Sequence, residues 1–202
     1  MATRKEKSEA VHQQILEAAN LRFQQYGFNK TTMAEIAKDC DMSAANLYRY
    51  FKNKMDIVAQ LAQQCMAEGE EKLRLIIDDQ QRSASVRLME YALCQLQHHY
   101  DEFVQRPKLN ELVEIVCQQH QHLVEKKIAG ELTHLAQLIQ QGVEQGEFQS
   151  QNIAEDAEAL HSALTIVGTP FFVPMFPLSE LERKAEHLVR LILQGLKKRP
   201  KG

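Results

Sequence analysis

The sequence has no uninterrupted apolar run of about eighteen residues, the length that a membrane-spanning helix requires. Its first residues, Met-Ala-Thr-Arg-Lys-Glu-Lys, are charged, and no apolar segment follows them. We therefore expect neither a signal peptide nor a membrane span. The four cysteines form no C-x-x-C pair, which favours reduced structural thiols over a disulfide framework. Together these absences predict a cytoplasmic protein.

The motifs that mark common enzyme classes are missing as well. There is no Gly-rich phosphate loop, no nucleophile elbow, no H-E-x-x-H and no carboxylate pair at a distinctive spacing. We also find no internal repeat. The sequence therefore predicts no enzymatic activity, no catalytic residues and no cofactor.

Positive charge is not in excess, because the net charge is −3. The charge is unevenly distributed, however. Residues 1–54 contain nine Lys or Arg against six Asp or Glu (+3), and residues 55–202 contain fifteen against twenty-one (−6). This asymmetry indicates that the amino-terminal part faces a polyanion. We expect a flexible arm, formed by Arg4, Lys5 and Lys7, that lies over the backbone of this polyanion. The alternative is a solvated tail.

What the chain does contain is helical periodicity. With 202 residues and 44% hydrophobic content it can bury a substantial core, and the apolar spacing predicts an all-α fold. Beyond residues 31–54, the expected helices span 8–26, 55–77, 84–105, 108–121, 123–144, 153–171 and 179–197. The inward positions of the first are expected to be Val11, Ile15, Ala19, Phe23 and Tyr26, with Gly27 ending it.

Residues 31–54 predict a helix-turn-helix. Met33, Ile36 and Ala37 form one apolar stripe, and Leu47 and Phe51 form a second with one of the neighbouring alanines. Two small apolar faces indicate two short helices packed together. The intervening turn is about three residues long, as this motif requires.

Polar residues stand where the two helices should begin. Thr32 is placed as an N-cap with Glu35 three residues later, as in a capping box, and Ser43 is placed to cap the second helix. The second helix, expected over 43–50, keeps a set of small and hydrogen-bonding side chains accessible: Ala44, Ala45, Asn46, Tyr48, Arg49 and Tyr50. Such a face suits the major groove, where amide and hydroxyl groups reach base edges.

Cationic side chains flank this helix. Lys52, Lys54 and the two tyrosines are expected to bind phosphate oxygens, which would hold the helix in register. Asn53 is placed to cap the next helix, whose positive end would favour a phosphate. The alternative is that the tyrosines are core aromatics and the lysines a solvated rim.

The pattern Thr32-x-x-x-Ile36-Ala37, followed by Met42-Ser43-x-x-x-Leu47-Tyr48-x-Tyr50-Phe51-x-Asn53-Lys54, resembles the amino-terminal signature of TetR/AcrR-type bacterial transcriptional regulators. The resemblance implies an all-helical homodimer whose first three helices bind operator DNA. It also implies a carboxy-terminal body that binds a small-molecule effector, usually releasing the operator, so we expect a repressor. The expected domains are 1–54 for DNA binding and 55–202 for effector binding and dimerisation.

The resemblance departs from the family at three positions. Ala45 and Asn46 stand where the family often has Gly and Thr, and Tyr50 stands where it often has His. These departures concern the base preference, not the DNA-binding role. The resemblance and the charge pattern together predict a set of DNA-contacting residues. They are Arg4, Lys5, Thr31, Thr32, Ser43, Ala44, Ala45, Asn46, Tyr48, Arg49, Tyr50, Lys52 and Lys54.

Effector candidates come from the apolar residues of the body helices, which are expected to line a mostly apolar pocket for a small apolar effector. They are Met89, Tyr91, Leu112, Val116, Leu135, Phe171 and Phe172. The alternative is that these residues are ordinary core. The Pro- and Phe-rich segment 169–177 is expected to form a pocket wall or part of a dimer contact.

The last two helices carry broad apolar stripes that favour a four-helix bundle between two copies of the chain. The stripes consist of Ala157, Leu160, Leu164 and Val167 on one helix, and Leu181, Ala185, Leu188, Ile192 and Leu196 on the other. The alternative is that both stripes close the subunit's own core.

Two further alternatives concern what the body does. Cys94-x-x-x-His98 and Cys117-x-x-His120 have spacings that place sulfur and imidazole on common helix faces, as in a soft-metal or redox sensor. Histidines are also common on Gln-rich helix surfaces, and we expect no bound metal. A DNA-bound protein that recruits a partner instead of sensing a small molecule would share the same amino-terminal part.

Overall fold

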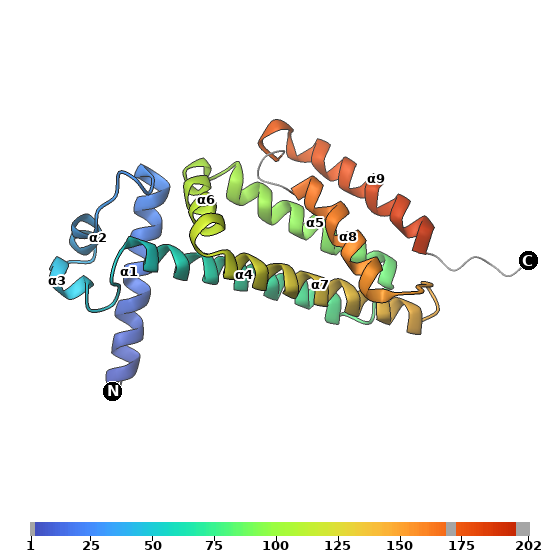
Figure 1. The fold of residues 1–202 in the computed structure, drawn as a ribbon, viewed down its shortest axis with the longest axis horizontal. Helices are drawn as coiled ribbons and strands as arrows, with labels where there is room; N and C mark the ends of the chain where they lie inside the picture. Colours follow the sequence, from blue (N-terminus) through green and yellow to red (C-terminus); the bar gives the residue numbers. More distant parts are fainter. Residues whose placement is uncertain (1–2, 169–172, 197–202) are drawn as a thin grey trace, which may run out of the picture. The chain divides into compact units, whose positions relative to one another are not determined.

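In the computed structural model, which describes residues 3–168 and 173–196, the chain is all-α, as predicted (Figure 1). Two short 3-10 helices, Pro107–Leu109 and Val173–Met175, punctuate the α-helices. The α-helices are α1 (Arg4–Tyr26), α2 (Met33–Asp39), α3 (Ala44–Leu47), α4 (Lys54–Asp78), α5 (Ala84–Phe103), α6 (Asn110–Gln119), α7 (Gln121–Glu144), α8 (Ile153–Gly168) and α9 (Leu178–Leu196). No helix within these ranges combines the length and the apolar character needed to cross a membrane.

Backbone contacts divide the chain into two compact units. The first comprises Met1–Cys65 and Arg106–Val124, and the second comprises Met66–Gln105 and Glu125–Gly202. The first unit therefore includes α6 besides the amino-terminal helices. This division reflects packing alone, so the functional division after residue 54 stays a prediction.

Helix α1 begins earlier than expected. Thr3 accepts a hydrogen bond from the Glu6 amide, and the Glu6 carboxylate accepts one from the Thr3 amide, so a capping box starts the helix at Arg4. The predicted flexible arm is therefore wrong, because Arg4, Lys5 and Lys7 lie in the first turns of α1. Their side chains remain exposed.

One expected inward position of α1 is also wrong. Tyr26 is 46% exposed, and the Arg22 guanidinium lies 5.3 Å from its ring centroid. Phe28, from the loop after the helix, packs against Phe23 with ring centroids 5.7 Å apart. Gly27 ends the helix as predicted, with a φ of +87° that a residue with a Cβ rarely adopts.

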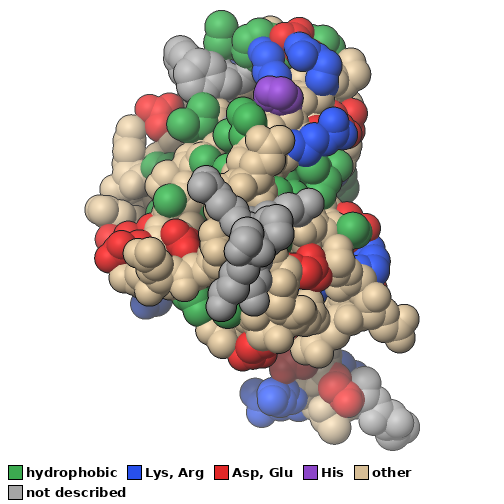
Figure 2. Space-filling model, turned by 90° about the vertical axis from the view of Figure 1, so that its right-hand side faces the viewer, with side chains coloured by type: hydrophobic (Ala, Val, Ile, Leu, Met, Phe, Trp, Pro, Cys, Tyr) green, Lys and Arg blue, Asp and Glu red, His purple; other side chains and the backbone are tan. Residues whose placement is uncertain are grey.

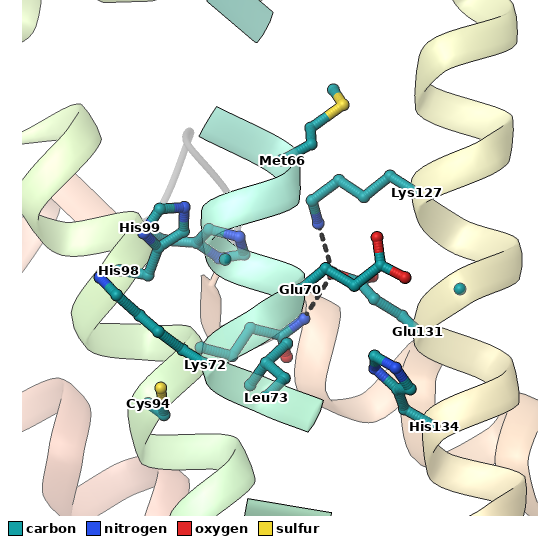
Figure 3. Close-up of a pocket in the computed structure, with 13 residues that line it drawn as sticks. Met66, Glu70, Lys72, Leu73, Cys94, His98, His99, Lys127, Glu131 and His134 are labelled. Atoms are coloured by element: carbon teal, nitrogen blue, oxygen red, sulfur yellow. Dashed lines mark hydrogen bonds and ion pairs between the residues drawn. The ribbon is translucent and has the colours of Figure 1, made fainter. Parts of the chain in front are cut away.

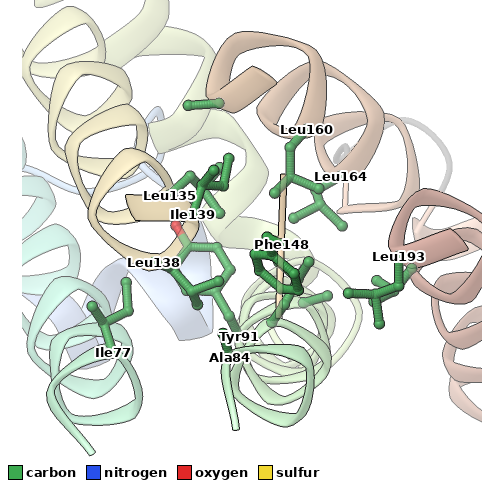
Figure 4. Close-up of a cluster of buried hydrophobic side chains, with 14 of the residues drawn as sticks. Ile77, Ala84, Tyr91, Leu135, Leu138, Ile139, Phe148, Leu160, Leu164 and Leu193 are labelled. Carbon is green, nitrogen blue, oxygen red and sulfur yellow. The ribbon is translucent and has the colours of Figure 1, made fainter. Parts of the chain in front are cut away.

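The second unit has an apolar core contributed by α4, α5, α7, α8 and α9 (Figure 4). Five residues of the stripes predicted for dimer contact, Ala157, Leu160, Leu164, Leu181 and Ala185, are buried within this unit. For these five the alternative interpretation is correct, because they close the subunit's own core. The side chain of Val167 lies outside the described residues. Other apolar side chains stay on the surface, and Figure 2 shows several of them among polar groups.

A buried arginine ties three helices of this unit together. Arg87 of α5 is fully buried and donates hydrogen bonds to the Ile77 carbonyl at the end of α4, 2.6 Å away, and to the Gln141 side chain of α7. A buried cation needs such acceptors, because leaving it unsatisfied would carry a large desolvation cost. No pattern in the sequence indicates this role of Arg87.

The segment between α7 and α8 includes Phe148, whose ring packs directly against Gly142 of α7. A Cβ built on Gly142 would lie 2.7 Å from Cε2 and 2.8 Å from Cγ of Phe148, which is itself buried. Only a residue without a side chain lets the ring approach α7 this closely. The contact fixes the path of the chain as it leaves the helix.

We expect Gly142→Ala to destabilise the protein, although alanine normally favours a helix by ~1 kcal/mol over glycine. The added methyl group overpacks the Phe148 site, at a cost of about 1 to 3 kcal/mol. Gly130→Ala in the same helix is the control, since its Cβ would be in ordinary van der Waals contact with the Glu70 carboxyl group, with Oε1 at 3.6 Å. Urea unfolding followed by circular dichroism distinguishes them; equal stabilisation of both variants would contradict the packing described here.

Candidate nucleic-acid interface

The two helices of the predicted motif begin at the caps that the sequence indicated. Thr32 accepts from the Glu35 amide at 3.3 Å, while the Glu35 carboxylate accepts from the Thr32 amide at 2.8 Å. Ser43 accepts from the Asn46 amide at 3.2 Å. Asn53 likewise accepts from the Asp56 amide in the first turn of α4, at 3.0 Å. These capping predictions are confirmed.

The turn between α2 and α3 is as short as predicted. It consists of Cys40, Asp41 and Met42, and Asp41 adopts the left-handed conformation with a φ of +53°. The Met42 amide donates to the Ala37 carbonyl at 3.0 Å, which closes the end of α2. Aspartate tolerates the left-handed region better than most residues, so the reversal needs no glycine.

Helix α3 is shorter than expected, because the α-helical geometry ends at Leu47 and a turn follows through Tyr50. Leu47 and Phe51 are buried as predicted, at 0% and 1% exposure. His12 of α1 stacks on Phe51, with ring centroids 4.5 Å apart and an interplanar angle of 25°. The short helix is therefore held by its buried side, which leaves the opposite side for a ligand.

The accessible side of this element carries small and polar groups. Ser43, Ala45, Tyr48 and Arg49 are exposed, and Tyr48 retains 52% of its surface. Ala44, Asn46 and Tyr50 are half-buried, whereas Thr32 and Lys52 are exposed at the flanks. Most of the residues predicted to contact DNA thus lie on one element or at its ends.

Two of the residues predicted to contact DNA have hydrogen-bond partners within the first unit. Thr31 is 1% exposed, and its hydroxyl donates to the Gly27 carbonyl at 2.8 Å. The Lys54 ammonium donates to the carbonyls of Phe28 and Thr31, at 2.7 and 2.5 Å, and lies 4.1 Å from the Phe28 ring centroid. Burial lowers the pKa of Lys54. Both side chains hold the loop between α1 and α2 through its backbone carbonyls.

Helix α6 holds the same loop from a distant part of the sequence. The Glu111 carboxylate accepts from the Phe28 amide at 3.0 Å and from the Asn29 amide at 3.4 Å. The Lys108 ammonium donates to the Gln25 carbonyl at the end of α1. No local pattern indicates these contacts, because they join residues 82 or 83 positions apart.

An ion pair joins α1 to α2. Arg22 donates two hydrogen bonds to the Asp39 carboxylate, at 2.6 and 2.8 Å, and one of its nitrogens lies 3.4 Å from Glu35. The hydrogen bonds from Arg22 lower the pKa of Asp39, and those from Thr32 lower the pKa of Glu35. The bidentate geometry fixes the angle between the helices more firmly than a single contact would.

The second unit contains a small pocket between α4, α5 and α7 (Figure 3). Its cavity volume is about 40 Å³, room for about three water molecules. Most of the lining residues have polar side chains, but the surface that they present to the cavity is largely apolar. The lining residues are Met66, Gly69, Glu70, Lys72, Leu73, Cys94, Gln95, His98, His99, Lys127, Gly130, Glu131 and His134.

None of the seven predicted effector residues is among these lining residues. Tyr91 and Leu135 are buried in the core, Met89 packs against it, and Leu112 and Val116 belong to α6 of the first unit. Phe171 and Phe172 lie outside the described residues. The prediction selected apolar side chains of the core, whereas the surface of the pocket comes from other residues, among them Met66 and Leu73 of α4.

The proposed metal ligands are divided between the units. Cys94 and His98 line the pocket, whereas Cys117 and His120 belong to the first unit. Within 3–168 and 173–196, no group of three or more His, Cys, Asp or Glu residues is arranged to hold a metal ion. Burial raises the pKa of the Cys94 thiol and lowers that of His98.

One of the lining residues is a buried carboxylate. Glu131 of α7 accepts from the Gln95 amide at 2.9 Å and from the Lys127 ammonium, and its other oxygen is 2.9 Å from His161 Nε2. Burial acts to raise the pKa of Glu131, but the contacts with Lys127 and His161 outweigh it and the pKa is lowered. Glu131 is therefore ionised at neutral pH.

Two capped helices joined by a three-residue turn, with an exposed polar face on the second, define a helix-turn-helix DNA-binding protein. Residues 15–61 match the family described as bacterial regulatory proteins, tetR family, and residues 84–189 match the tetracyclin repressor-like C-terminal domain. The chain belongs to the TetR family of transcriptional regulators. This family is not enzymatic, in agreement with the expectation from the sequence.

The chain is also similar to individual proteins, and the solved structures among them share its fold. The HTH-type transcriptional regulator YfiR of Bacillus subtilis (strain 168), itself uncharacterized, is 25% identical over 146 residues, 72% of this chain and 71% of its own. A putative TetR-family regulator from Mesorhizobium loti has a solved structure with a TM-score of 0.74 at 20% identity, covering 98% of this chain and 100% of its own. SmeT, the repressor of the Stenotrophomonas maltophilia multidrug efflux pump SmeDEF, has a TM-score of 0.66 at 19% identity, covering 93% and 90%.

The two lysines near α3 are expected to behave differently when replaced by alanine. Lys52→Ala should leave stability unchanged and lower DNA affinity, with the slope of log K against log salt reduced by about one. Lys54→Ala should destabilise the fold by about 1 to 3 kcal/mol, because two loop carbonyls lose their donor. Fluorescence anisotropy with labelled duplex and urea unfolding provide the measurements. The assignment of Lys54 is wrong if its removal changes only the salt slope.

Proposed function

We propose that the protein is a cytoplasmic repressor that binds a palindromic operator as a homodimer and leaves it when a small molecule binds the second unit. The observation that carries this proposal is the accessible face of α3, whose buried side is fixed by Leu47 and Phe51. In this proposal residues 1–54 read DNA, and residues 55–202 bind the effector and the second subunit.

DNA recognition would combine base and phosphate contacts. Ala44 and Ala45 permit close approach to the groove, and the Asn46 amide is of the kind that reads adenine edges. Thr32, Lys52 and the exposed Arg4 and Lys5 would bind phosphates. One short helix reads few base pairs, so specificity requires two of them on a symmetric site.

Dimerisation would use the outer faces of α8 and α9. Ile166 is 64% exposed on α8 and Leu191 is 53% exposed on α9. An open groove alongside is lined in part by Ala159, Ala163 and Gly195, whose small size would permit a partner helix to approach closely. Large exposed apolar side chains on adjacent helices support an interface with a second copy of the chain.

Effector binding is supported by the pocket in the second unit. SmeT, which shares this fold at 18% identity, has been solved in complex with triclosan, so the fold accommodates a small organic molecule in that protein. The pocket favours a sensor over a DNA-bound protein that only recruits a partner.

A map of genomic fragments bound by the purified protein at low ionic strength tests the operator proposal. We expect a shared palindromic sequence among the bound fragments. Tyr48→Ala should weaken binding to all duplexes alike, and Asn46→Ala should change the preference at one position of each half-site by about 1 to 3 kcal/mol. Failure to bind any fragment, or identical preferences for the Asn46 variant, would contradict the proposed reading mode.

Self-association should be sensitive to charge on α8 and α9. Ile166→Asp and Leu191→Asp are expected to shift the protein from dimer to monomer, because each would place a carboxylate in a desolvated contact. Leu75→Asp is the matched control, a 58% exposed leucine on α4. Analytical ultracentrifugation measures the association constant, and a dimer that tolerates both substitutions would exclude this interface.

A further inference from the structure

The pocket of the second unit holds the one buried carboxylate among the described residues. Glu131 is 8% exposed, and the other buried polar side chains of this unit are Arg87, Gln95 and His134. A carboxylate in such a position requires a cation or several hydrogen bonds, because burying it unpaired would be very costly. The chemistry of its partners therefore indicates what the pocket can accept.

The partners of Glu131 differ in how firmly they are held. Gln95 belongs to α5 and is itself 9% exposed, and the His161 side chain from α8 is 16% exposed. Lys127 lies one turn earlier on the same helix, reaches Glu131 through four methylene groups and is 30% exposed. Lysine has a long, flexible side chain, so its ammonium is the partner most easily withdrawn.

Electrostatics favours a positively charged ligand in its place. If Lys127 withdraws, the Glu131 charge faces the pocket directly, and an anion placed there would be strongly repelled. Lys72 and Glu70 also line the pocket, but both are exposed and of opposite sign, so solvent screens them and they largely cancel. The buried charge therefore decides the sign of the ligand.

The remaining lining indicates a ligand with a short apolar part and an N–H group. Met66 and Leu73 of α4 contribute apolar surface, and His134 lies one turn beyond Glu131 on α7 (Figure 3). His134 is 8% exposed, and its Nδ1 has no hydrogen-bond partner within the described structure. In the tautomer protonated at Nε2, this nitrogen would accept a hydrogen bond from an ammonium group.

We propose that the pocket binds small organic cations, of the alkylammonium type, which replace the Lys127 ammonium on Glu131 and donate to His134. This inference rests on the proposed function only in taking such a cation to be the effector. The cavity of about 40 Å³ admits only a small molecule, and withdrawal of the Lys127 stem would enlarge it. A lysine side chain is chemically n-butylamine, which makes this amine the natural probe.

The test compares n-butylamine, n-butanol and butyrate, which have similar size but charges of plus one, zero and minus one. Each is titrated into the full-length protein, with binding measured by calorimetry and by the shift in Tm. We expect the amine to bind and the other two to bind at least about tenfold more weakly. Preference for butyrate, or equal binding of all three, would overturn the proposal.

Variants at residue 127 make the test specific to this site. Lys127→Ala removes the resident ammonium and opens its space, so n-butylamine should bind roughly tenfold more tightly and recover lost thermal stability. Lys127→Met also removes the charge but fills the space, so it should gain much less. Equal gains for both variants, or no gain for Lys127→Ala, would show that the amine binds elsewhere and would overturn the proposal. Glu131→Gln should abolish the preference for the amine, and a preference that persists in this variant would also overturn the proposal.

Operator binding is measured separately, so that the two proposals can fail independently. Amine binding that lowers operator affinity supports both. Amine binding with unchanged operator affinity supports the cation site and contradicts the effector role. Absence of charge preference in a protein that binds its operator normally contradicts the cation site alone.

Discussion

The loop between α1 and α2 imposes the main constraint on the first unit, because its backbone polar groups have few partners within the loop itself. A cation from α4 and a carboxylate from α6 satisfy these groups. Lys54 donates hydrogen bonds to two carbonyls, and Glu111 accepts hydrogen bonds from two amides. Thr32, which starts α2, directly follows this loop. The position of the element proposed to read DNA therefore depends on two charged side chains that bond to the backbone of this loop.

Buried charge also organises the second unit. Arg87 donates to a main-chain carbonyl at the end of α4 and to the Gln141 side chain of α7, and Glu131 of α7 bonds to side chains of α5 and α8. Each of these residues has a specific set of acceptors or donors, whereas apolar contacts are less directional. Together with the core of Figure 4, they define how α7 packs against its neighbours.

Local features were predictable from the sequence and distant ones were not. Caps at Thr32 and Ser43 and the buried pair Leu47 and Phe51 follow from spacing over a few residues, so the motif and its family were identified correctly. The roles of Thr31 and Lys54 depend on contacts with backbone groups elsewhere in the unit. A lysine beside a recognition helix looks identical in sequence whether it binds a phosphate or a carbonyl. The pocket was missed for a related reason, since apolar patterns identify core residues and say little about which polar side chains surround a cavity.

The contact between Lys127 and Glu131 has a consequence for sensitivity. An ammonium attached to the same helix competes with any molecule in solution at a local concentration that is typically on the order of millimolar for a short flexible tether. In the proposed role of this pocket, a ligand would displace Lys127 from Glu131 only at a concentration comparable to this local concentration. The Lys127 side chain would then set the ligand concentration at which the proposed change in operator binding occurs.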